Sequence, residues 1–257
     1  MSDLQTKAEA FSALHVPGQP LVLFNVWDAG SAKAVTTAGA QALATGSWSV
    51  AAANGFGDGE KIPLDLAIEN LTRIVRATAL PVSVDIESGY GKTAEAVGQT
   101  IRRTLEAGAV GCNLEDSFPE NGTLREIAEQ IERIKQARRA ADAAGIPYFI
   151  NARTDVFFQK PAEQHDDSML QAAIERARAY AEAGASGIFA PGLIDLEMIS
   201  RLAATLHLPL NIMASGKAPG LAALASAGVA RVSHGPGPYL TVMKALEEMA
   251  RAGAQRL

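Results

Sequence analysis

The sequence predicts an α/β protein of the TIM or (β/α)8 barrel class, with a single domain over residues 1–257 and one extra helix at the N-terminus. Two observations support this. Eight short apolar segments recur along the chain, and segments with helical periodicity separate them. Glycine or Leu-Pro stands where a helix ends and an apolar segment follows, as at Gly108, Gly184 and Leu80-Pro81. Eight such units in a chain of this length match the usual size of the barrel.

The expected strands are rich in Val, Ile, Leu and Phe, which is typical of parallel strands buried on both faces. A doubly wound sheet is the alternative arrangement of the same units. No Gly-x-Gly-x-x-Gly follows the first strand, so a dinucleotide-binding fold is disfavoured. The eight strands are expected over Pro20–Val26, Ala42–Thr45, Pro81–Glu87, Gly111–Asp116, Pro147–Arg153, Gly187–Ala190, Pro209–Met213 and Val229–Ser233.

The expected helices carry their apolar residues on one face. The first covers Met1–Leu14 and has a polar outer face, so it is not a signal peptide. Between the third and fourth strands, Val97 and Ile101 mark the buried side of a helix. Thr93 and Ser168 are residue types that accept hydrogen bonds at a helix start, and we expect them to be N-caps.

The composition limits the function classes. Hydrophobic residues make up 48% of the chain and charged residues 20%, as in ordinary globular proteins. The net charge of −5 argues against a nucleic-acid partner and a polybasic membrane anchor. No apolar run approaches the roughly 18 residues that span a bilayer. The single cysteine, Cys112, excludes an intrachain disulfide and predicts a small buried side chain and a cytoplasmic location.

Acidic residues gather at the carboxyl ends of neighbouring strands, where barrel enzymes carry their active sites. Asp85 and Glu87 are two positions apart and so point to the same side, and Glu115 ends the next strand. Crowded carboxylates favour a neutralising cation, and oxygen ligands without His or Cys suit Mg²⁺ or Mn²⁺. The alternative is that these carboxylates pair with Arg or Lys, or cap the next helix.

Two further features face the same end of the barrel. Arg153 ends the fifth strand, where it is placed to hold an oxyanion or a carboxylate, or to serve as the counter-ion of Glu115. Gly46, Ser47 and Trp48 follow the second strand and offer a hydroxyl and successive N–H groups in a tight turn. Such a turn can bind a carboxylate, or it can be an ordinary loop of small residues.

Taken together, these strand ends resemble the isocitrate lyase and phosphoenolpyruvate mutase superfamily over nearly the whole chain. The similarity depends on the order of the motifs and on their placement, one to a strand. The motifs are Asn25-Val26-Trp27-Asp28-Ala29-Gly30-Ser31-Ala32, Val84-Asp85-Ile86-Glu87-Ser88-Gly89-Tyr90-Gly91, Asn113-Leu114-Glu115-Asp116 and Asn151-Ala152-Arg153-Thr154-Asp155.

The resemblance implies a Mg²⁺-dependent enzyme that acts on small 2-oxo or 2-hydroxy carboxylates through a pyruvate-type enolate. It implies that Asp85, Glu87 and Glu115 hold the metal, partly through waters. It also implies roles for residues around the substrate: Gly46, Ser47 and Trp48 at its carboxylate, Asp58 near the metal and the substrate as a catalytic group, and Arg153 and Asn211 in contact with the substrate.

The chain departs from the lyases of this family in the loop after the fourth strand. Their loop carries a catalytic cysteine, whereas Phe118–Leu124 contains neither Cys nor Lys. Phe118-Pro119 is similar to the mutase and phosphonopyruvate hydrolase branch, although Glu120 and Gly122 stand where that branch has Lys and Asn. Glycine, proline and asparagine in this loop predict a mobile lid.

Three functions therefore remain open. The leading one is a carbon–carbon lyase or decarboxylase, the second is a P–C mutase or hydrolase, and the third is a non-catalytic binder of 2-oxo acids. The resemblance also implies a homo-oligomer, dimer or tetramer, formed in many relatives by exchange of a C-terminal helix. Here the last helix is expected over about Tyr239–Ala252, almost at the chain end. His234 stands near the expected mouth, either as an acid–base group or in a structural role.

Overall fold

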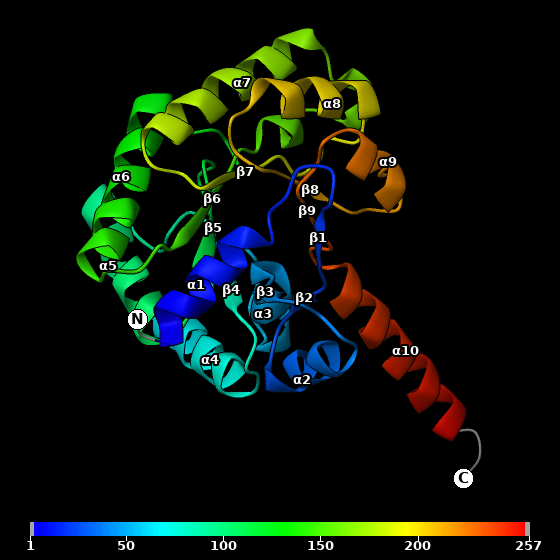
Figure 1. Ribbon diagram of the computed structural model, residues 1–257. Helices are drawn as coiled ribbons and strands as arrows, with labels where there is room; N and C mark the ends of the chain where they lie inside the picture. Colours follow the sequence, from blue (N-terminus) through cyan, green and yellow to red (C-terminus); the bar gives the residue numbers. More distant parts are fainter. Residues whose placement is uncertain (1–2, 255–257) are drawn as a thin grey trace.

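The computed structural model describes residues 3–254 and forms a closed parallel barrel ringed by helices (Figure 1). Its nine strands have the order β1-β9-β8-β7-β6-β5-β4-β3-β2, and all neighbours are parallel. The strands are β1 (Leu21–Leu23), β2 (Asn25–Val26), β3 (Leu43–Thr45), β4 (Val82–Asp85), β5 (Gly111–Glu115), β6 (Phe149–Arg153), β7 (Gly187–Phe189), β8 (Leu210–Met213) and β9 (Arg231–Ser233).

All eight expected strands are present, so the predicted barrel class is confirmed. The first is divided at Phe24 into β1, which pairs with β9, and β2, which pairs with β3. One stretch of chain therefore forms both ends of the sheet and closes it.

Ten α-helices are described, and those between strands bury one face against the sheet. Val97 and Ile101 are fully buried, as their periodicity predicts. The helices are α1 (Asp3–Ala13), α2 (Ala29–Thr37), α3 (Ser47–Ala53), α4 (Leu64–Arg76), α5 (Ala94–Glu106), α6 (Ile127–Ala143), α7 (Asp167–Glu182), α8 (Leu196–Thr205), α9 (Leu221–Ser226) and α10 (Gly237–Ala254), with 3-10 turns at Val156–Phe158 and Ala162–Gln164.

Two expectations about helix ends have different outcomes. Thr93 caps α5, since its side chain accepts from the Ala96 N–H. The expectation for Ser168 is wrong: Asp166 caps α7 by accepting from the Met169 N–H, and Ser168 lies inside the first turn and donates to Asp166. A carboxylate two residues earlier reaches the free N–H groups and displaces the serine from that position.

Helix α1 covers the end of the barrel where the strands begin (Figure 1). Phe11 packs edge-on against Phe149, and the His15 ring stacks on Phe149 at 4.0 Å between centroids. Burial and the nearby charge of Arg231 lower the pKa of His15 to about 3, so this histidine stays neutral. Met1 and Ser2 of the expected first helix lie outside the described residues.

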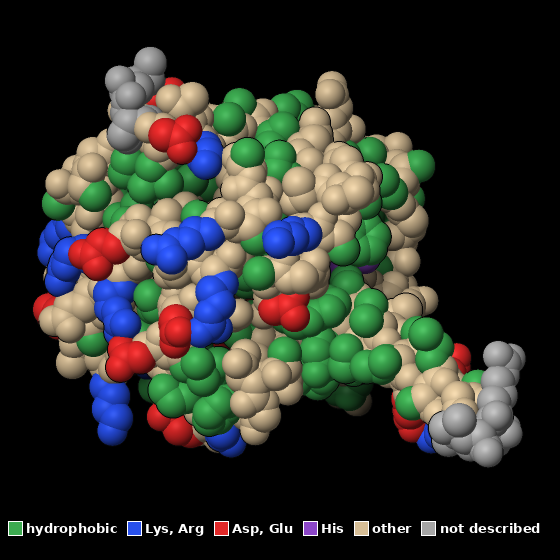
Figure 2. All heavy atoms as spheres, turned by 90° about the horizontal axis from the view of Figure 1, so that it is seen from below, with side chains coloured by type: hydrophobic (Ala, Val, Ile, Leu, Met, Phe, Trp, Pro, Cys, Tyr) green, Lys and Arg blue, Asp and Glu red, His purple; other side chains and the backbone are tan. Residues whose placement is uncertain are grey.

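Helix α10 projects away from the barrel (Figure 1). Figure 2 shows it extending from the body beside a surface region where hydrophobic side chains gather. Along its length Leu240, Val242, Leu246 and Met249 are between 47 and 72% exposed. In the described part of the chain, no helix is long and apolar enough to cross a membrane.

Candidate active site

A cavity of about 190 Å³ lies at the carboxyl ends of the barrel strands. Parallel strands in a barrel bring their last side chains to this one end, which explains why distant sequence positions meet here. Six predicted site residues line the cavity: Gly46, Ser47, Trp48, Asp58, Asp85 and Arg153. The other three, Glu87, Glu115 and Asn211, are buried residues that do not line it.

Ser47 contacts one of the predicted metal ligands directly. Its backbone N–H and its hydroxyl donate to Asp85 Oδ2 at 3.1 and 2.9 Å. The tight turn that we expected over Gly46, Ser47 and Trp48 is instead the start of helix α3, with Gly46 as the N-cap. The donors predicted for a substrate carboxylate therefore hold a carboxylate of the protein itself.

Asp58 lies in the loop between α3 and α4 and reaches the cavity wall. Burial and then the charge of Asp85 raise the pKa of its carboxyl above the ordinary value. A carboxyl group that keeps its proton closer to neutral pH is better suited to exchange that proton with a ligand.

Glu60 and Glu87 join two loops beside the cavity. The Glu60 N–H donates to Glu87 Oε2 at 2.6 Å, while the Glu60 carboxylate accepts from the Ser88 hydroxyl and the Tyr90 N–H at 2.7 and 2.8 Å. Glu60, Glu87 and Tyr90 all have positive φ, at 55°, 51° and 54°. This strained conformation is uncommon for residues with side chains, and it places both glutamates within reach of each other's loop.

Arg153 is the counter-ion of Glu115, and its role toward a bound anion stays a prediction. It lines the cavity, and its guanidinium pairs with Glu115 at 2.8 Å and with both carboxylate oxygens of Asp155 at 2.6 and 3.1 Å. Ser117 donates to the same Asp155 at 2.6 Å. Burial raises the pKa of Glu115 above its ordinary value although Arg153 opposes that shift. Arg153 is thus held rigidly by two carboxylates.

The acidic residues fit a hydrated magnesium ion better than a closed metal cage. In residues 3–254 no group of three or more His, Cys, Asp or Glu side chains is arranged to hold an ion directly. Burial raises the pKa of Glu87 to about 7, and the charges of Asp58, Asp85 and Glu60 add to the effect. Mg²⁺ keeps several waters and is commonly bound by one or two carboxylates, which matches such a spread set of oxygen donors.

The segment predicted to be a lid forms a closed turn, and its mobility stays a prediction. Ser117 and Leu124 form an antiparallel bridge, and the Phe118 ring lies against the Arg125 guanidinium at 4.1 Å. The turn also touches the loop of Asp58: a Cβ on Gly59, whose φ is +87°, would lie 2.8 Å from the Pro119 carbonyl oxygen. A side chain at position 59 would force these two loops apart.

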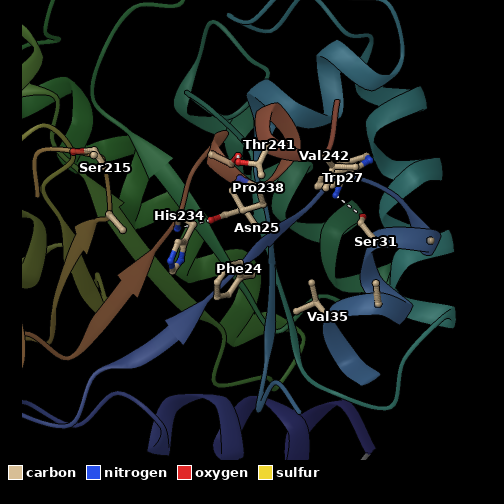
Figure 3. Close-up of a pocket in the computed structure, with 15 residues that line it drawn as sticks. Phe24, Asn25, Trp27, Ser31, Val35, Ser215, His234, Pro238, Thr241 and Val242 are labelled. Atoms are coloured by element: carbon tan, nitrogen blue, oxygen red, sulfur yellow. Dashed lines mark hydrogen bonds between the residues drawn. The ribbon is translucent and has the colours of Figure 1, made fainter. Parts of the chain in front are cut away.

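Other polar residues singled out in the sequence lie outside the cavity. His234 stacks on Phe24 at 4.1 Å in a larger neighbouring groove (Figure 3). Cys112 is fully buried, as expected, and burial raises the pKa of its thiol to about 12.

Three residues of the site were not singled out from the sequence. Asn25 and Asn113 line the cavity, and Glu60 joins the loops beside it. Both asparagines stand in the motifs at the strand ends, so their position could have identified them. Nothing in the sequence signals Glu60, because its positive φ and its partners arise only when the loops meet.

Comparison with known proteins identifies the family. The family model for phosphoenolpyruvate phosphomutase matches residues 11–253. A crystal structure of a candidate phosphonomutase from Burkholderia cenocepacia J2315 is 58% identical, with a TM-score of 0.95 and coverage of 97% of this chain and 99% of that chain.

Two curated relatives are enzymes. The 2-methylisocitrate lyase of Escherichia coli K12 is 32% identical, covering 84% of this chain and 73% of that protein. An oxaloacetate decarboxylase of Chromohalobacter salexigens is 34% identical, covering 74% of this chain and 65% of that protein. A structure of phosphonopyruvate hydrolase with oxalate and Mg²⁺, 22% identical, shares the fold with a TM-score of 0.84 over 97% of this chain and 87% of that chain.

The raised pKa of Glu87 predicts a pH dependence of stability. In the unfolded chain this carboxyl ionises near its ordinary 4.5, but in the folded protein it does so near 7. Without divalent cations, the free energy of unfolding should therefore fall as the pH rises from about 4.5 to about 7, by up to about 3 kcal/mol. Urea denaturation in EDTA at a series of pH values measures this change.

Glu87→Gln cannot ionise, so it should lose this part of the slope. Glu120→Gln, at an exposed glutamate of the nearby turn, should keep it. If the free energy of unfolding of Glu87→Gln depends on pH as it does in the natural protein, the raised pKa does not belong to Glu87.

Proposed function

Because the chain belongs to the phosphoenolpyruvate mutase/isocitrate lyase superfamily, we propose that it is a Mg²⁺-dependent lyase that cleaves or decarboxylates a small 2-oxo or 2-hydroxy carboxylate. The observation that carries this proposal is the cavity of about 190 Å³ that Asp58, Asp85 and Arg153 line together. Its size suits an acid of a few carbon atoms.

The metal role is proposed for Asp85, Glu87 and Glu115, with Mg²⁺ or Mn²⁺ held largely through waters. When bound, the ion withdraws charge from the carbonyl of the substrate. Ser47 and the Trp48 N–H bind the substrate carboxylate at the start of α3, where the helix dipole favours an anion. For this, Ser47 has to exchange its contact with Asp85 for one with the substrate.

Arg153 and Asp58 carry the proposed chemistry. Glu115 and Asp155 hold Arg153 in place. Its guanidinium therefore does not have to reorient in order to stabilise the oxygen that becomes negative as the bond breaks. Asp58, with its raised pKa, moves the proton that bond cleavage or enolate release requires. Cys112 takes no part, because it is fully buried and stays a thiol at neutral pH.

A P–C mutase or hydrolase is the second candidate. The 58% identity to the candidate phosphonomutase favours it, as does Phe118-Pro119 in the turn over the cavity. Against it, Arg153 is the one Lys, Arg or His among the residues lining the cavity, and a phosphoryl group usually meets several cations.

Activity assays with Mg²⁺ test the proposed function. We expect pyruvate release from oxaloacetate or from a substituted malate, and Asp85→Ala should abolish both this activity and Mg²⁺-dependent thermal stabilisation. Release of pyruvate and phosphate from phosphonopyruvate alone supports a P–C hydrolase, and conversion of phosphonopyruvate to phosphoenolpyruvate supports a P–C mutase. Binding of these acids without turnover indicates a non-catalytic binder, and unchanged Mg²⁺ affinity in Asp85→Ala contradicts the metal assignment.

The role of Asp58 depends on the substrate. If the enzyme decarboxylates oxaloacetate, no base is needed to start the reaction, so Asp58→Asn should slow turnover only a few-fold. If it cleaves a hydroxy acid or a phosphonate, Asp58→Asn should lower kcat by roughly 100-fold or more while Mg²⁺ binding persists. Loss of Mg²⁺ binding in this variant assigns Asp58 to the metal instead.

We also propose that the chain forms a homo-oligomer through α10. A groove of about 850 Å³ runs between α2 and the start of α10, and Phe24, Trp27, Val35 and Val242 line it (Figure 3). Farther along the same helix, Leu246 and Met249 are exposed with no described surface covering them. A second copy that offers its own α10 would cover both surfaces, as the resemblance implies.

Light scattering after size-exclusion chromatography tests this assembly. We expect a dimer or tetramer for the natural chain and a smaller species for Leu246→Glu, because a charge on the apolar face opposes its burial. Leu221→Glu, at a similarly exposed leucine of α9, should leave the assembly intact. A monomeric natural chain, or an unchanged mass in Leu246→Glu, contradicts the proposal.

A further inference from the structure

A polar layer lies beneath the cavity, inside the barrel. Barrel interiors are usually filled by branched apolar side chains, but here the middle layer contains Asn113, Asn151, Asn211 and Arg231, each at most 4% exposed. Register pairs Asn113 with Asn151 and Asn211 with Arg231, and hydrogen bonds across the interior join Asn113 to both Asn151 and Arg231. Of these four, Asn113 also lines the cavity above.

Arg231 crosses the barrel interior and contacts an amide rather than a carboxylate. Its Nη2 donates to Asn113 Oδ1 at 3.3 Å, although Arg231 on β9 and Asn113 on β5 lie on opposite sides of the barrel. No ion pair within residues 3–254 includes Arg231, and its Nε and Nη1 have no hydrogen-bond partner. Burying an unpaired charge is costly, so a physical advantage must offset that cost.

The hydrogen-bond polarity of arginine provides that advantage. A guanidinium has only donors, so the atom of Asn113 that faces Arg231 has to be its oxygen. Asn151 Nδ2 donates to the same oxygen at 2.9 Å. These two donors occupy the amide oxygen of Asn113 and so fix which end of the amide faces them, whereas its Nδ2 makes no hydrogen bond to any described residue.

Arg231 keeps this polarity over the physiological pH range. Burial lowers the pKa of its guanidinium to about 10, a shift that the charge of Asp85 partly opposes. At neutral pH the side chain therefore remains protonated and cannot accept a hydrogen bond. A neutral glutamine or methionine at this position would let both amides turn over.

We propose that Asn113 donates its side-chain amide to an oxygen of the bound carboxylic acid, and that Arg231 is the positioning residue that fixes the orientation of this amide. The inference rests on the proposed function in one respect only, that the cavity takes a small carboxylate. The Asn113 amide would give the cavity a neutral donor, in addition to the cation Arg153 and the carboxylates that line it. Asn113 would contact the ligand, whereas Arg231 would act only through Asn113.

Calorimetry with oxalate in the presence of Mg²⁺ tests the donor. Asn113→Asp keeps an acceptor for Arg231 but presents a carboxylate oxygen to the ligand, so oxalate should bind at least about tenfold more weakly. Oxalate affinities are compared at saturating Mg²⁺, because the new carboxylate stands in register with Asp85 and changes the affinity for Mg²⁺ alone. Thr104→Val, which removes the buried hydrogen bond to Tyr148, is the control that changes stability without changing oxalate affinity.

Variants of Arg231 test the positioning role. Arg231→Lys still donates and should retain most of the oxalate affinity, whereas Arg231→Gln can accept and should lose about as much as Asn113→Asp. In an Asn113→Ala background, which removes the amide without adding a charge, Arg231→Gln should have no further effect on affinity. The side-chain amide resonance of Asn113, identified by its loss in Asn113→Asp, should shift in Arg231→Gln and not in Arg231→Lys, with or without oxalate.

Any result that differs from these expectations contradicts a specific part of the proposal. Full oxalate affinity in Asn113→Asp excludes the donor, and additive losses in the double variant exclude action through Asn113. An Asn113 resonance that is the same in Arg231→Gln as in the natural protein excludes the positioning role, whatever binds. If the natural protein binds neither oxalate nor pyruvate with Mg²⁺, the proposed function itself fails, and the resonance still decides whether Arg231 orients the amide.

Discussion

Repulsion among carboxylates is the constraint on which the rest of the site depends. Burial and then the charge of Asp85 raise the pKa of Asp58, and burial followed by the charges of Asp58 and Asp85 raises the pKa of Glu87, while Arg153 is already shared between two other acids. Such a cluster persists only because neighbouring groups hold each carboxylate in place. The same crowding supplies the attraction for a divalent cation and the raised pKa that acid–base chemistry needs.

The supporting contacts extend well outside the cavity. Arg133 on α6 is almost fully buried and donates to the carbonyl oxygens of Ser88 and Gly91, which fixes the loop that carries Glu87. On the other side, Tyr180 and Arg176 donate to Asp116, whose second oxygen accepts from the Asp155 N–H. Helices of the outer ring thereby determine where the acidic side chains at the strand ends stand.

The sequence predicted the positions of the strands and the barrel topology that joins them. Apolar runs bounded by glycine located the strands, and strand alternation placed Asp85 and Arg153 at one cavity. The Glu60–Glu87 contact was not predicted, because positive φ at a glutamate depends on tertiary partners. Nor did the sequence separate Asn211, which is buried and does not line the cavity, from Asn113, which does, since both are asparagines within apolar strands.

The division of the first strand at Phe24 has a consequence for biosynthesis. The β2 half finds β3 within a few tens of residues, but the β1 half has to wait for β9, and the contact of Leu23 with His234 joins positions 211 apart. As the chain emerges from the ribosome, β1 therefore remains an unpaired apolar edge until β9 has been made. Closure of the barrel is a late, long-range step, and β1 is the segment most exposed to misassociation before it.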